Sequence, residues 1–125
     1  MSPRQQLCYA LGELAYAVAK IDGEVVKEER EKLHKIISED LSPVDYNFEI
    51  SKIIFEMVDK QNKDAETVYN DAVKTIQCYS DSFDRDMRLV FLRTLEKIER
   101  ASPPIVSAQK ELLQRFRHEI KQLSN

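Results

Sequence analysis

Apolar residues recur at intervals of three and four along six segments of this chain, and this spacing limits its fold more than any other feature. The pattern covers approximately residues 3–20, 27–40, 43–60, 64–80, 84–101 and 107–123. Residues at this spacing share one face of an α-helix. No segment shows the sustained two-residue alternation that is typical of a half-buried strand, and the chain contains only two glycines. The sequence therefore predicts an all-α fold, a compact bundle of about six helices joined by short loops.

Chain length and cysteine usage favour one intracellular domain. The 125 residues are enough to bury a sizeable core, so we predict a single domain over residues 1–125. Cys8 and Cys78 lie far apart inside helical patterns, which predicts buried, reduced thiols and a reducing compartment. No apolar run approaches the roughly 20 residues of a membrane span. We therefore expect a cytoplasmic protein without a membrane span.

Apolar spacing also predicts which side chains enter the core and where the helices end. The first helix should bury one face, formed by Leu7, Leu11, Leu14, Ala15 and Val18. The third helix should bury a broad apolar stripe, formed by Ile50, Ile53, Ile54, Met57 and Val58. Breaks are expected at 42–43 and 102–104, where a serine precedes proline. Asp64 is a candidate cap for the fourth helix, and Ser82 or Asp84 for the fifth.

The connection between the first two helices is an acidic turn. Gly23 follows Asp22 where the chain must leave the first helix, and glycine accepts positive φ there without penalty. The next helix opens with carboxylates in its first turn, close to unpaired backbone N–H groups. Among them, Glu28 and Glu31 each precede a lysine by four residues, so we expect exposed ion pairs with Lys32 and Lys35. Glu29 instead precedes Leu33, which places it beside the core face.

A family resemblance appears at these residues. Ala19 to Val25, which reads A-K-I-D-G-E-V, with Glu29 four places later, resembles the A-x-x-D-G-x-V/I-x-x-x-E signature of TerB-like tellurite-resistance domains. The resemblance implies an all-helical bacterial domain of the cytoplasm that is linked to tellurite and other stress resistance, with an acidic site proposed to hold a metal ion. The sequence departs from the signature at Lys20 and Lys27, and both lysines add positive charge beside the acids.

The chain also contains an internal repeat. A shift of 80 residues places Val25 and Val26 on Ile105 and Val106, and it continues without a gap through the following helix. This alignment predicts two related helix hairpins whose loops meet, with Val25 beside Ile105. Glu29 falls on Gln109 in this alignment, so only the first loop keeps its acidic residues.

The acidic loop leaves two functional hypotheses. An EF-hand is excluded, because Val18 and Lys20 stand where two strong calcium ligands are required. A weaker site for a divalent metal ion such as calcium remains, built from Asp22, Glu24, Glu29 and backbone carbonyls. The alternative is that Asp22 and Glu29 only satisfy backbone N–H groups. The chain is then a helical protein–protein interaction module whose loop is purely structural.

Other functional classes find little support in the sequence. His34 and His118 lack a metal-ligand partner at helical spacing, so we interpret them as surface histidines. No nucleophile motif or glycine-rich phosphate loop is present, which argues against an enzyme. Basic residues after Arg85 are interrupted by acids and the net charge is −3, so a solvated face is favoured over a nucleic-acid surface. We expect a protein partner.

Overall fold

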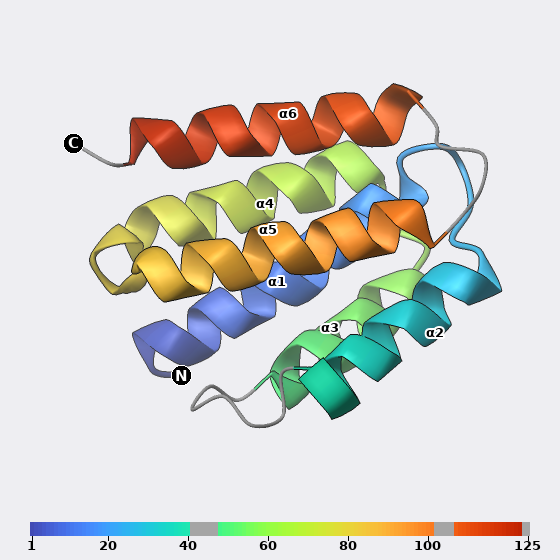
Figure 1. Ribbon diagram of the computed structural model, residues 1–125, viewed down its shortest axis with the longest axis horizontal. Helices are drawn as coiled ribbons and strands as arrows, with labels where there is room; N and C mark the ends of the chain where they lie inside the picture. Colours follow the sequence, from blue (N-terminus) through green and yellow to red (C-terminus); the bar gives the residue numbers. More distant parts are fainter. Residues whose placement is uncertain (41–47, 102–106, 124–125) are drawn as a thin grey trace.

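Helices account for all the regular secondary structure in the computed structural model, which describes residues 1–40, 48–101 and 107–123. The elements are α1 (Pro3–Lys20), α2 (Lys27–Lys35), a π-helical turn (Ile36–Asp40), α3 (Glu49–Lys60), α4 (Ala65–Cys78), a 3₁₀ turn (Ser80–Ser82), α5 (Arg85–Arg100) and α6 (Ser107–Gln122) (Figure 1). Within the described residues there are six α-helices and no strand. The predicted all-α bundle is confirmed.

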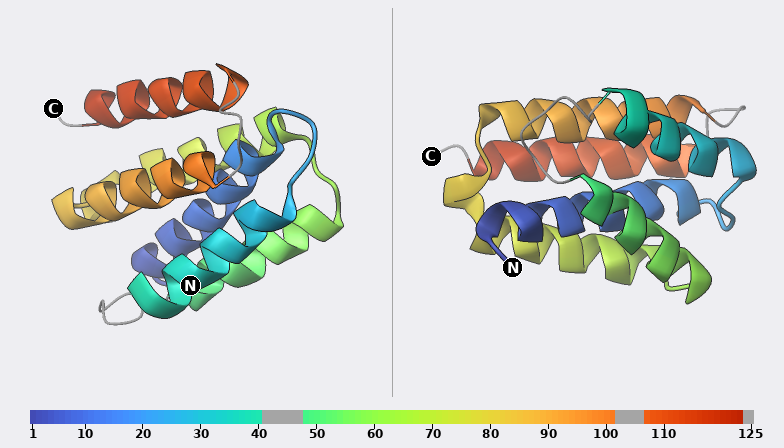
Figure 2. Two further views of the ribbon diagram at one scale, coloured as in Figure 1. Left: turned by 45° about the vertical axis from the view of Figure 1, so that its right-hand side comes forward. Right: turned by 90° about the horizontal axis from the view of Figure 1, so that it is seen from below.

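Helix α1 is the centre of the bundle. It contacts α3, α4, α5 and α6, and Figure 2 shows it between α5 and α6 on one side and α3 and α4 on the other. From Leu7 to Ala19 every residue except Tyr9 is buried. The predicted core face of α1 is confirmed, but burial extends to its other faces as well, because helices cover it from several directions. Small residues on its remaining faces, including Ala10, Ala17 and Ala19, allow this close packing.

Helices α1 and α3 approach each other closely at Gly12. A Cβ atom placed on Gly12 would lie 2.4 Å from the carbonyl oxygen of Ser51. The hydroxyl of Ser51, which is fully buried, donates a hydrogen bond of 2.6 Å to the carbonyl oxygen of Cys8 on α1. Gly12 is thus required here for backbone contact between two helices.

Side-chain caps define several helix ends. Ser2 and Gln5 exchange hydrogen bonds in a capping box at the start of α1. The predicted cap Asp64 accepts a hydrogen bond from the backbone N–H of Thr67. Asp84 caps α5 by accepting a hydrogen bond from the backbone N–H of Met87. Of the two predicted caps for this helix, Ser82 and Asp84, the structure thus selects Asp84. The predicted breaks at 42–43 and 102–104 lie outside the described residues.

Three predicted core positions face solvent. Ile53 and Met57 of α3 are 59% and 38% exposed, whereas Ser51 and Phe55 are buried in the same helix. The face of α3 that meets α1 is therefore rotated relative to the predicted stripe. Cys78 is also exposed, in contrast to buried Cys8. It follows buried Ile76 by two residues, about 200° around the helix, so it points away from the core.

Candidate functional site

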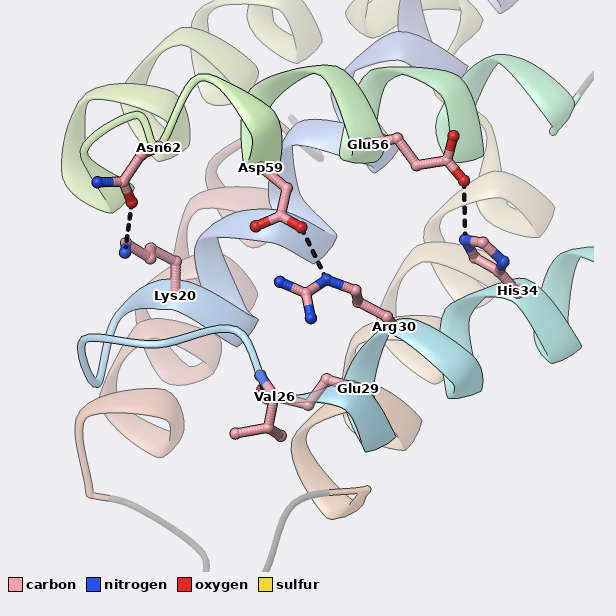
Figure 3. Close-up of polar contacts among 8 residues, drawn as sticks. All are labelled: Lys20, Val26, Glu29, Arg30, His34, Glu56, Asp59 and Asn62. Carbon is pink, nitrogen blue, oxygen red and sulfur yellow. Dashed lines mark hydrogen bonds and ion pairs between the residues drawn. The ribbon is translucent and has the colours of Figure 1, made fainter.

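The loop between α1 and α2 depends on Gly23. Its φ of 114° is a conformation that other residues rarely adopt, as the sequence predicted for this turn. Lys20, one residue before the loop, holds it in place. The Lys20 ammonium donates to the carbonyl oxygen of Gly23 at 3.0 Å and to the side-chain oxygen of Asn62 at 2.7 Å, linking the loop to the end of α3 (Figure 3).

Glu29 turns inward at the start of α2. Its side chain is fully buried, and its Oε1 accepts a hydrogen bond of 3.1 Å from the backbone N–H of Val26. This is the acceptor half of a capping box, so the predicted capping role of Glu29 is confirmed. Its other oxygen, Oε2, accepts a bond of 2.9 Å from the side-chain amide of Gln109 on α6. One carboxylate therefore joins the beginnings of α2 and α6.

The sequence predicted no contact between Gln109 and Glu29. The Gln109 side chain is fully buried, and its Nε2 donates both to Glu29 and to the carbonyl oxygen of Val18, at 3.0 Å. Its Oε1 is buried without a hydrogen-bond partner among the described residues. The shift of 80 residues had aligned Gln109 with Glu29. If two related hairpins meet at their loops, residues that the repeat aligns come close together. The alignment of Gln109 with Glu29 was therefore the sequence signal that could have predicted this contact.

Burial governs the charge state of Glu29. Removal from water raises the pKa of its carboxyl to about 7, and the nearby charge of Asp22 adds a smaller upward contribution. The hydrogen bonds from Val26 and Gln109 and the positive charge of Arg30 lower this pKa. The group therefore changes its charge near neutral pH.

The other two predicted metal ligands lie on the surface. Asp22 and Glu24 are exposed on the loop, whereas Glu29 is buried. In the part of the chain that the structure describes, no three His, Cys, Asp or Glu residues form a group suited to a metal ion. Asp22, Glu24 and Glu29 therefore do not converge on one position for a metal ion. Metal binding by this loop stays a prediction.

Polar side-chain contacts attach α2 to its neighbour α3. Arg30 Nε donates to Asp59 at 2.7 Å, and His34 Nε2 lies 3.0 Å from Glu56 (Figure 3). His34 is therefore only partly the surface histidine of the sequence interpretation, because it contacts a second helix. The periodicity of one helix could not predict these contacts, since they depend on how α2 lies against α3.

A second buried acid lies on α1. Glu13 is 8% exposed, and burial raises the pKa of its carboxyl to about 7, with a further upward contribution from Asp71 of α4 and a lowering one from Lys63. No motif marked Glu13 in the sequence. It became buried because α1 is covered on more than one face.

Replacement of Glu13 by glutamine is expected to reduce the pH dependence of stability. The folded pKa lies above the ordinary value of 4.5, so the folded protein binds a proton more readily than the unfolded chain. The free energy of unfolding should thus fall as pH rises from 4.5 to about 7 and remain low above it. Near pH 8, Glu13→Gln should be more stable than wild type by about 1–3 kcal/mol.

Denaturant unfolding near pH 5 and pH 8 measures this effect. Glu24→Gln is the matched control, because it removes an exposed carboxylate from the loop and should leave the pH dependence unchanged. A Glu13→Gln protein that loses as much stability as wild type between the two pH values would contradict the prediction.

Comparison with known proteins identified no relative. No protein-family model matches the chain, and neither the curated proteins nor the solved structures gave a match. Within residues 1–40, 48–101 and 107–123, no helix combines the length and apolar character needed to span a bilayer.

Proposed function

We propose that this chain is a non-catalytic, TerB-like protein-interaction domain in which the loop around Asp22 and Gly23 is a structural turn. The observation that carries the proposal is the position of Glu29. A carboxylate that serves an exposed cation site must face the other ligands, but Glu29 is buried and accepts hydrogen bonds from Val26 and Gln109. This role favours the structural reading of the loop over the metal-binding one.

Two features support the TerB-like part of the proposal. The signature residues from Ala19 to Glu29 lie on a helix–turn–helix unit, α1 and α2. Glu29 and Gln109, which the internal repeat aligns, are in direct contact. We therefore propose a pseudo-twofold relation between the α1–α2 and α5–α6 hairpins. The predicted neighbour of Val25 in that arrangement, Ile105, lies outside the described residues.

Calorimetric titration of metal-free protein tests the structural role of the loop. Calcium, zinc and manganese are each expected to give no saturable heat, because Asp22 and Glu24 are exposed and do not gather with Glu29. Asp22→Ala should behave like wild type. The metal-binding alternative predicts saturable heat in wild type that Asp22→Ala abolishes and Glu29→Gln weakens. That result would overturn the structural reading.

The biological setting follows from the resemblance and is tested by deletion of the gene. The deletion strain should be more sensitive to tellurite than its parent, and the wild-type gene should restore growth. If the loop is only structural, a gene carrying Asp22→Ala should restore growth equally well. Unchanged sensitivity in the deletion strain would contradict the stress-response part of the proposal, whereas failure of Asp22→Ala alone would show that the loop has a chemical role.

A further inference from the structure

An open groove lies between α2, from Glu28 to Lys35, and the C-terminal end of α5. Its volume is about 450 Å³, and charged side chains form nearly all of its lining: Glu28, Glu31, Lys32, Lys35, Lys97 and Arg100. Helices α2 and α5 contact each other, and they lie next to each other in Figures 1 and 2. Four cations face two carboxylates, so the lining carries an excess of positive charge in a chain whose net charge is −3.

Two of these cations lack the partners that the sequence predicted. Lys32 and Lys35 were expected to pair with Glu28 and Glu31, but neither pair forms in the described structure. Glu31 instead lies 3.5 Å from Lys27, on the preceding turn. In the described part of the chain Lys32 and Lys35 make no ion pair. Their charge remains available in the groove.

The opposite wall adds cations at a similar spacing. Lys97 and Arg100 of α5 lie three residues apart, as Lys32 and Lys35 do on α2, and residues three apart on a helix are neighbours about 5–6 Å apart. The guanidinium of Arg100 lies 3.9 Å from the carboxylate of Glu96, a long distance for an ion pair, and the Arg100 side chain is 68% exposed. Both walls of the groove therefore carry positively charged side chains, and those of Lys32 and Lys35 on α2 make no ion pair among the described residues.

The form of the groove indicates the kind of ligand. Small-molecule sites usually enclose most of the ligand in a mainly apolar pocket. This groove is open and charged, which suits an extended surface of a macromolecule. Glu28 and Glu31 lie in the same lining and would repel the continuous phosphate backbone of a nucleic acid. A peptide can instead place carboxylates against the cations and donors against the two glutamates.

We propose that the α2–α5 groove binds an acidic peptide segment of a partner protein. The proposal rests on the interaction function proposed above and names the chemistry of the partner. Complementary charges on both walls orient the segment and accelerate its association, and dissolved salt weakens these exposed contacts.

Fluorescence anisotropy tests the proposal with a fluorescein-labelled peptide in which glutamate alternates with glutamine, whose amides can donate to Glu28 and Glu31. Wild-type protein should bind the peptide at low ionic strength and progressively less as salt is added. The double variant Lys35→Glu and Arg100→Glu, which changes two exposed residues on opposite walls, should weaken binding about tenfold or more. The matched control is Lys74→Glu and Lys121→Glu. It makes the same change in net charge at exposed positions of α4 and α6, outside the groove, and should retain binding.

Three outcomes would overturn the proposal. Equal loss of affinity in both double variants would show that only net charge matters. Absence of peptide binding by wild type would exclude an acidic segment as the ligand. Equally tight binding of a labelled RNA homopolymer, lost in the groove variant, would assign the groove to nucleic acid. Circular dichroism and thermal melting confirm that each variant is folded. None of these results bears on the loop, which the metal titration tests separately.

Discussion

Replacement of Gly12 by alanine is expected to destabilise the protein by about 1–3 kcal/mol, the usual cost of adding atoms to a well-packed core. In an ordinary helix interior this substitution stabilises by about 1 kcal/mol, so the expected sign is reversed. The reason is the distance of 2.4 Å between the new Cβ and the carbonyl oxygen of Ser51. A backbone oxygen cannot rotate away as a side chain can, so α1 and α3 must separate.

Denaturant unfolding of wild type, Gly12→Ala and Ser51→Ala tests this expectation. Ser51→Ala is the matched control, because it removes the hydrogen bond to Cys8 but adds no atoms at the helix contact. It should cost about 1 kcal/mol, the usual net contribution of one hydrogen bond. Separation of α1 and α3 would also reduce protection of α3 amides from hydrogen exchange in Gly12→Ala. A Gly12→Ala protein as stable as wild type, or more stable, would show that the two helices do not meet as closely as described.

Replacement of Gln109 by leucine is expected to cost about 2–4 kcal/mol near pH 8, because it leaves two buried acceptors without their donor. These acceptors are the carboxylate of Glu29 and the carbonyl oxygen of Val18. The loss should be smaller near pH 5. The hydrogen bond from Gln109 lowers the pKa of Glu29, so its removal raises that pKa further. The variant should therefore lose stability more steeply than wild type as pH rises.

A second substitution separates the charge from the packing. Glu29→Gln keeps an oxygen that accepts from Val26 and removes the buried charge, but its amide NH₂ then faces the NH₂ of Gln109. These effects oppose each other, so near pH 8 the single substitution should alter stability by no more than about 1 kcal/mol. Combined with Gln109→Leu, it should recover part of the stability lost near pH 8. The coupling energy comes from the four proteins of the double-mutant cycle. If Gln109→Leu is equally destabilising in both backgrounds and at both pH values, the amide does not stabilise the Glu29 carboxylate.

Local sequence signals determined the helices and several of their ends. Pro3 and Lys20 bound α1 as expected, and Asp64 and Asp84 cap the helices that follow them. These features depend on residues within one or two helical turns. Hydrogen bonds between a cap and a nearby N–H require no knowledge of the rest of the chain. Gly23 was predictable for the same reason, because the conformation of a turn is a local property.

Packing decided which faces of those helices are buried. Periodicity locates an apolar stripe, but it does not reveal how many neighbours surround a helix. Helix α1 is covered from several directions, and this alone explains why Glu13 is buried. On α3, Ile53 and Met57 match the apolar spacing as well as Ile54 and Val58 do. They are exposed because the face of α3 that meets α1 includes Ser51 and Phe55 instead.

The candidate site divides in the same way between local sequence and tertiary structure. From the sequence alone, Glu29 could be placed at the start of a helix beside the core, with Gln109 as its aligned counterpart. Only the tertiary structure decided that the two side chains bond to each other, that Asp22 and Glu24 remain outside, and that Lys32 and Lys35 line a groove with α5. The physical reason is that hydrogen bonds and ion pairs act over a few ångströms. Helix spacing along a sequence predicts which side chains share a face, but the packing of whole helices determines which faces come within that distance.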